Sequence, residues 1–141
     1  MLVDTGSLGD ILFRDTYLKL GMSRAQIRPV ANPLVGFTGD AVSPLGMSNL
    51  MVTMGKHPQQ AMKMVEFTIV DMADGTYNGI IGRPTLSQFK AVVSLIHLKM
   101  KFPTRHGRGE MQGSQGGNDP DGMGKQTPGM VAPEDVHTLE A

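Results

Sequence analysis

The chain has 141 residues and a formal net charge of +0, so no overall charge attracts it to nucleic acid or to an anionic membrane. It contains no cysteine, which excludes a disulfide framework and a zinc site built on cysteine. No apolar run approaches the roughly 20 residues that a membrane-spanning helix needs, and the first residues lack the basic and apolar regions of a signal peptide. We therefore expect an intracellular protein, located in the cytoplasm, that makes no membrane contact.

The chain divides into two parts of different composition. Residues 1–104 carry periodic apolar patterns, whereas residues 105–141 are rich in glycine, proline, glutamine and aspartate. A segment of the second kind buries too little apolar surface to offset the conformational entropy that it would lose on folding. The sequence thus predicts one folded domain over residues 1–104 and a disordered linker or tail over residues 105–141.

The first predicted elements are short. An apolar strand at residues 2–3 is followed by a turn at Asp4–Ser7 and by a second short strand at residues 11–12. Apolar residues then recur at helical spacing along residues 13–20, and Gly21 is a natural residue at which a helix ends. The pattern predicts one short helix directly after the second strand.

Strands dominate the middle of the chain. Residues 34–35 and 41–42 flank a glycine-rich stretch and predict a hairpin. Apolar and polar residues alternate along residues 50–54 and again along residues 65–69, which is typical of strands with one buried face.

The last patterned elements complete a mainly β domain. Met62 and Met64 fall on the opposite parity from the apolar residues of 65–69, which predicts a bulge before that strand. Proline predicts the start of a short helix from Pro84 to Phe89, and residues 97–102 alternate as a two-faced strand. Many short strands with one or two short helices favour a small β-barrel or closed sandwich.

Two motifs carry the chemical signal. Asp4–Gly6 reads Asp-Thr-Gly and places a carboxylate at the end of an apolar strand, although such a tripeptide alone is more often an ordinary Asx-type turn. Later in the chain, Tyr77–Arg83 places two branched apolar residues before Gly82, which indicates a buried strand that leads into a turn.

Four groups of segments, which include these two motifs, follow the same order as in a known family. They are Leu2–Ser7 with Asp10–Phe13, Pro33–Asp40 with Pro44–Gly46, Tyr77–Leu86, and Ala91–Ser94 with His97–Thr104. In this order they resemble the retropepsin-like aspartic protease domain of plant Ty3/gypsy-type LTR retrotransposon polyproteins. The resemblance covers residues 1 to about 110, which is essentially the whole patterned region.

The resemblance implies a small closed β-barrel of the acid-protease type that acts as a homodimer. Asp4 of each subunit would form a pair that shares one proton and activates water against peptide bonds of the element's own polyprotein, without a metal or another cofactor. Thr5 and Gly6 would complete the catalytic turn, and Arg83, with Asp10 as its candidate partner, would anchor it. The implied substrate-binding residues are Ser7, Gly36, Phe37, Thr38, Gly39, Ile81 and Gly82.

Two departures from the family pattern leave an alternative open. Leu8 and Gly9 stand where the family has a second serine and a small residue, and the β-hairpin that precedes the family's catalytic strand is missing. The alternative is a catalytically inactive retropepsin-like remnant that acts at most as a dimerisation or peptide-binding module.

Other polar groups are not expected to carry chemistry. The four histidines are dispersed without metal-ligand spacing, so we expect no metal site. A mild basic run has no interleaved aromatic residues that could stack on bases, so we expect no contact with nucleic acid. This run consists of Lys99, Lys101, Arg105 and Arg108.

Overall fold

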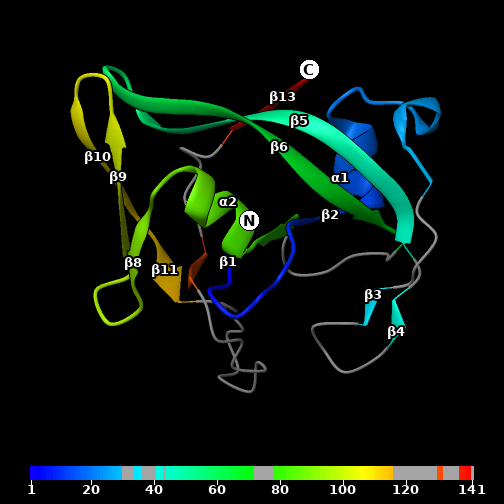
Figure 1. The fold of residues 1–141 in the computed structure, drawn as a ribbon, viewed down its shortest axis with the longest axis horizontal. Coiled ribbons are helices and arrows are strands. Elements are labelled where there is room, and N and C mark those ends of the chain that lie inside the picture. The colour runs from blue at the N-terminus through cyan, green and yellow to red at the C-terminus, as the bar shows by residue number, and fades with distance from the viewer. Residues whose placement is uncertain are drawn as a thin grey trace.

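The computed structural model describes residues 1–29, 34–35, 41–42, 44–71, 78–115, 130–131 and 137–140. These residues form three β-sheets, two short α-helices and one 3-10 turn (Figure 1). The predicted fold class, mainly β with one or two short helices, is confirmed to that extent. No helix in the described ranges is long and apolar enough to cross a lipid bilayer.

The largest sheet has eight strands in the order β11-β12-β1-β7-β2-β6-β5-β13. β1 runs parallel to β7, while β2 pairs antiparallel with β7 and parallel with β6. Among the described strands, β11 and β13 each have a single neighbour, so the sheet is open and the closed barrel stays a prediction. In sheet order the strands span Ser114–Gln115, Met130–Val131, Leu2–Val3, Gly79–Ile81, Ile11–Phe13, Gln59–Val70, Pro44–Lys56 and His137–Glu140.

The hairpin of β5 and β6 is the longest feature of the fold and crosses much of the molecule in Figure 1. The alternation predicted from the sequence is confirmed, because one side of each strand is buried and contributes to the core. Burial of these apolar side chains removes their surface from water and stabilises the hairpin against the rest of the fold. The buried residues are Leu50, Val52, Met54, Val65, Phe67 and Ile69.

The bulge predicted near Met62 and Met64 is wrong. β6 pairs with β5 in regular register through both residues, and the irregularity of this pair lies between Pro44 and Gly46. Met62 and Met64 are 56% and 39% exposed. They occupy outward-facing positions of a regular strand. Their offset from the apolar residues of 65–69 therefore means that they are exposed, and the alternation of the strand is not interrupted.

The helix predicted over residues 13–20 is confirmed as α1, Arg14–Lys19. Its buried Tyr17 lies within hydrogen-bond distance of Ser48, with 2.9 Å between the two hydroxyl oxygens, and this joins α1 to β5. Gly21 follows with φ of 85°, a value that glycine adopts without steric cost. A 3-10 turn, Arg24–Gln26, then begins at a capping box formed by Ser23.

The smaller elements agree with the predicted patterns. β3, Leu34–Val35, pairs with β4, Ala41–Val42, as the predicted hairpin. α2 spans Arg83–Gln88, one residue earlier at each end than the predicted helix from Pro84 to Phe89, with proline in its first turn.

The second sheet shows that the predicted domain boundary at residue 104 is placed too early. It contains β10, β9 and β8, which span Gly107–Gln112, Lys99–Thr104 and Val92–Ser94. The boundary falls inside the hairpin of β9 and β10, and Met111 of β10 is buried in the core. Strands β11 to β13 also lie within residues 105–141, the predicted linker or tail, of which residues 116–129, 132–136 and 141 are outside the described residues.

Packing explains why glycine stands at position 109 of β10. A Cβ atom added at Gly109 would lie 2.7 Å from Cζ of Phe102, and one added at Gly55 would lie 2.9 Å from the same atom. The ring of Phe102 therefore packs directly on two glycine backbones, which a larger residue at either position would prevent.

Candidate active site

The Asp-Thr-Gly turn begins where β1 ends. The N–H of Asp4 donates to the carbonyl of Ile81 at 2.9 Å, which continues the parallel pairing of β1 with β7 by one residue. The N–H of Ser7 then donates to the carbonyl of Asp4 at 3.2 Å and closes the turn. β12 pairs with the other edge of β1, so the strand that carries Asp4 is held on both sides.

The carboxylate of Asp4 is oriented by its own turn. The N–H of Gly6 donates to Oδ1 of Asp4 at 2.9 Å. A Cβ atom at Gly6 would lie 3.3 Å from this oxygen, so glycine allows the close approach of backbone and carboxylate. Asp4 is partly buried, whereas Thr5 and Gly6 are exposed. The arrangement leaves an oriented carboxylate beside an open surface.

The second motif is bonded directly to the first. The N–H of Arg83 donates to the carbonyl of Ser7 at 2.9 Å, and Nε of Arg83 donates to the carbonyl of Thr5 at 2.8 Å. Ser7 is buried and its hydroxyl donates to the carbonyl of Gly9 at 2.8 Å. Two segments that are 78 positions apart in the sequence thus form one rigid unit around Asp4.

The expected partnership of Arg83 with Asp10 is not formed. Arg83 anchors the turn through the backbone carbonyl of Thr5, and Asp10 accepts a hydrogen bond from the N–H of Gly82 at 2.8 Å. Thr5 and Arg83 are both exposed, so this hydrogen bond lies at the surface. The side chains of Arg83 and Asp10 still join the two motifs, but each bonds to a backbone group of the other motif and not to the other side chain.

Asp10 is a buried carboxyl, with 4% of the residue exposed. Burial raises its pKa above the usual value, and the hydrogen bond from Gly82 and the contacts with the hydroxyl and the N–H of Thr85 lower the pKa in part. The Thr85 hydroxyl lies close to Asp10 but outside ordinary hydrogen-bond geometry. Asp10 therefore satisfies donors at the start of α2, where Gly82 offers no capping side chain.

Sequence reasoning missed the role of Asp10 as an acceptor at the start of α2, although the sequence contains a signal for it. A helix that begins after glycine needs an acceptor from elsewhere for its first N–H groups. A carboxylate placed directly before a buried strand, such as Asp10 before β2, is a candidate acceptor of this kind.

Gly82 fits tightly against the first motif. A Cβ atom there would lie well inside van der Waals contact with the carbonyl oxygen of Gly9 and 2.9 Å from the carbonyl oxygen of Ser7. At Gly9 itself, an added Cβ atom would meet nothing within 4 Å. The two glycines of the site therefore differ in kind, since one is required by packing and the other is not.

The predicted substrate-binding residues have different positions. The side chain of Ile81 is fully buried in the core, and Ser7 is also buried. Gly36, Phe37, Thr38 and Gly39, which were predicted as the flap, lie outside the described residues. Substrate contact by any of these residues stays a prediction.

Titratable side chains of the described residues do not gather as a metal site. No group of three or more histidine, aspartate or glutamate residues is arranged to hold an ion in the described ranges.

Comparison with known proteins gives only distant likenesses, among solved structures. No family model matches the chain, and no curated protein matches it. Among solved structures, the retroviral protease-like domain of Ddi1 from Leishmania major is similar, with a TM-score of 0.48 and 12% sequence identity. The match covers 94% of this chain and 78% of that domain. At this TM-score the likeness is too distant to assign a family or an activity to the chain.

Proposed function

We propose that the chain is an aspartic endopeptidase that acts as a homodimer and hydrolyses peptide bonds of a plant retrotransposon polyprotein. The observation that supports this function best is the position of Asp4. Its carboxylate is fixed by the N–H of Gly6 at 2.9 Å and lies beside exposed residues, in a turn that Arg83 joins to the end of β7.

The homodimer follows from the need for two carboxyl groups. Hydrolysis of a peptide by this route requires one carboxylate as base and one carboxylic acid as proton donor. The chain has a single Asp-Thr-Gly motif. Asp10 is not free to serve as the second group, because it is buried and bonded to Gly82. A second copy of Asp4 is then the natural source of the missing carboxyl.

In the proposed mechanism the two Asp4 carboxyls share one proton, because two like charges at short distance do not both ionise. The ionised member takes a proton from water, whose oxygen forms a bond to the peptide carbonyl carbon while the other carboxyl protonates the carbonyl oxygen. Proton transfer to the amide nitrogen then lets the carbon–nitrogen bond break. No covalent intermediate is formed with the protein.

The test is a peptide-cleavage assay of the full chain from about pH 4 to pH 7, with Asp4→Asn and the matched control Asp15→Asn. The amide introduced by Asp4→Asn keeps an oxygen acceptor for the N–H of Gly6, so we expect unchanged stability and a loss of activity of about 10⁴-fold or more. Asp15 lies on α1, away from the turn, and its substitution should leave cleavage unchanged. Equal cleavage by wild type and Asp4→Asn would refute the role of Asp4.

The inactive remnant is the second candidate, and the environment of Leu8 favours it. This residue is 80% exposed, directly after the turn that carries Asp4. An apolar side chain at this point offers a contact to another chain and no polar group that could take part in catalysis. This candidate predicts dimerisation or peptide binding by the wild type with no cleavage at any pH of the assay.

A further inference from the structure

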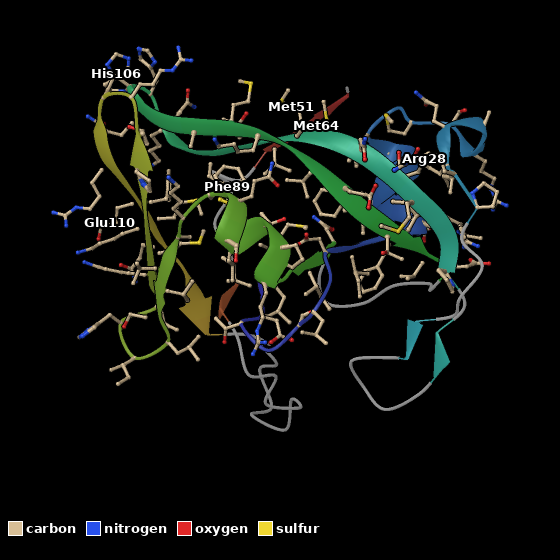
Figure 2. All side chains as sticks on the ribbon, in the orientation of Figure 1. Arg28, Met51, Met64, Phe89, His106 and Glu110 are labelled. Atoms are coloured by element: carbon tan, nitrogen blue, oxygen red, sulfur yellow. The ribbon has the colours of Figure 1, made fainter. Side chains whose placement is uncertain are left out.

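The outer face of the sheet of β8, β9 and β10 has a composition unlike its inner face. Met100, Phe102 and Met111 are buried on the inner side. The residues between them in the strands, among them Lys101 and Glu110, lie on the outer side, because successive side chains of a strand point to opposite faces. Figure 2 shows the labelled Glu110 on the side of β9 and β10 that faces away from the rest of the molecule.

A groove of about 570 Å³ lies along this sheet. The side chain of Val92 contributes to its apolar floor, and Lys90, Lys101 and Arg108 contribute cationic groups to its lining. Val92 is 71% exposed, which leaves its side chain free for contact. A second hollow of about 400 Å³ adjoins the first and shares Val92 and Lys101 with it.

The charge on this face is predominantly positive. Within the described residues, Glu110 is the acidic side chain on the face, and it pairs with Lys99 at 3.2 Å. The pKa of Glu110 is lowered first by its hydrogen bond and charge interaction with Lys99 and further by the charges of Lys101 and Arg108. One carboxylate and four cations therefore lie on this face or in the lining of its groove, and three of the cations form no ion pair with any described residue. These three are Lys90, Lys101 and Arg108.

The lining distinguishes between anionic ligands. Single-stranded nucleic acid is bound by exposed aromatic rings that stack on bases, and the only aromatic group among the described lining residues, Phe102, is buried to 1% exposure. An aliphatic floor such as Val92 instead suits an aliphatic side chain. β8 has one described neighbour, β9, so its other edge is open to pairing with an extended chain.

We propose that this groove binds an extended acidic peptide segment in which an aliphatic side chain lies on Val92 and flanking carboxylates meet Lys101 and Arg108. The occupant is thus a polypeptide, selected by charge complementarity and by one apolar contact. The groove shares no residue with the turn that carries Asp4. This proposal therefore does not rest on the proposed protease activity.

The test measures binding of a fluorescein-labelled peptide, with one Leu flanked on both sides by Glu, to the full chain by fluorescence anisotropy. The double variant Lys101→Glu with Arg108→Glu should weaken binding about tenfold or more, because two attractive pairs become repulsive. Val92→Ser, which leaves every charge in place, should weaken binding by a few fold. The control Lys19→Glu, on the exposed surface of α1, should leave the affinity unchanged.

Circular dichroism of each variant verifies that the fold is retained, and two further probes complete the design. A peptide with Gln in place of Glu should bind at least about tenfold more weakly than the acidic peptide. Oligothymidylate should bind more weakly than the acidic peptide at the same ionic strength. The proposal is overturned if the acidic peptide fails to bind, if Lys19→Glu matches the double variant, or if oligothymidylate binds more tightly, which would indicate a nucleic-acid surface.

Discussion

The substitution Gly82→Ala tests the contact between the two motifs of the candidate site. Gly82 has φ of −104°, which alanine adopts freely, so the backbone itself adds no strain. The added methyl group would instead press on the carbonyl oxygens of Gly9 and Ser7. These atoms belong to the backbone and cannot rotate away as a flexible side chain would. The turn that carries Asp4 must move if alanine is to fit.

The cost of this movement can be worked out from the contacts. Overpacking in a tight interior costs about 1–3 kcal/mol. Displacement of the turn also weakens the hydrogen bond from Arg83 to Ser7, which contributes about 1 kcal/mol. We expect Gly82→Ala to lower the free energy of unfolding by about 2–4 kcal/mol, a large share of the roughly 5–15 kcal/mol that stabilises a typical domain.

Urea unfolding followed by circular dichroism measures this change, and Gly9→Ala is its matched control. Gly9 belongs to the same turn, but a Cβ atom there meets nothing within 4 Å, so its substitution should change stability by no more than about 0.5 kcal/mol. If both variants unfold at the same urea concentration, the close approach of Gly82 to the turn is not present in solution, and the reasoning fails.

Two further substitutions address buried polar groups. Burial raises the pKa of Asp10 above 3.8, its value in an unfolded chain, so the contribution of this group to stability is full below that pH and is lost as pH rises through the folded-state pKa. The free energy of unfolding of Asp10→Asn should accordingly rise relative to wild type between acid and neutral pH in urea titrations, and a constant difference would contradict this. Tyr17→Phe removes a hydroxyl that contacts Ser48 in the interior, and thermal unfolding should show a loss of about 1–2 kcal/mol. If Tyr17→Phe lowers the free energy of unfolding as much in a Ser48→Ala background as in the wild type, the two hydroxyls do not interact.

Periodicity of apolar residues was sufficient for much of the fold. The alternation of Leu50, Val52 and Met54 predicted a buried strand face correctly, because a two-residue period has few alternatives when every second side chain is apolar. The same rule failed at Met62, where an apolar residue occupies an exposed position. Apolar residues are common at protein surfaces, so parity alone does not separate a bulge from an exposed methionine.

Composition misplaced the end of the folded part. Gly107 and Gly109 made β10 look like linker, since glycine is usually a sign of flexible chain. In the structure, position 109 requires glycine because the ring of Phe102 packs on its backbone. A packing requirement between two residues on neighbouring strands is invisible until the strands have been paired.

The two motifs of the candidate site could be located from the sequence, but the hydrogen bonds that join them could not be predicted. The motifs at Asp4 and Gly82 could be located from their own sequence, and the structure brings them together. That Arg83 would bond to a carbonyl and Asp10 to an N–H depends on the exact path of two turns. Side-chain types alone favour pairing of opposite charges, and they contain no information about backbone donors and acceptors.

The neighbours of β1 have a consequence for the order in which the protein folds. β5 and β6 are joined by a tight turn and can pair as soon as both exist. By contrast, β1 at the start of the sequence pairs with β7 and β12, which begin only at Gly79 and Met130. Closing such long loops costs entropy before any contact is gained, so these pairings form late and folding is slow. We expect the candidate site to be assembled only after residues 130–131 have left the ribosome, so a nascent chain would hold the hairpin of β5 and β6 long before it holds an oriented Asp4.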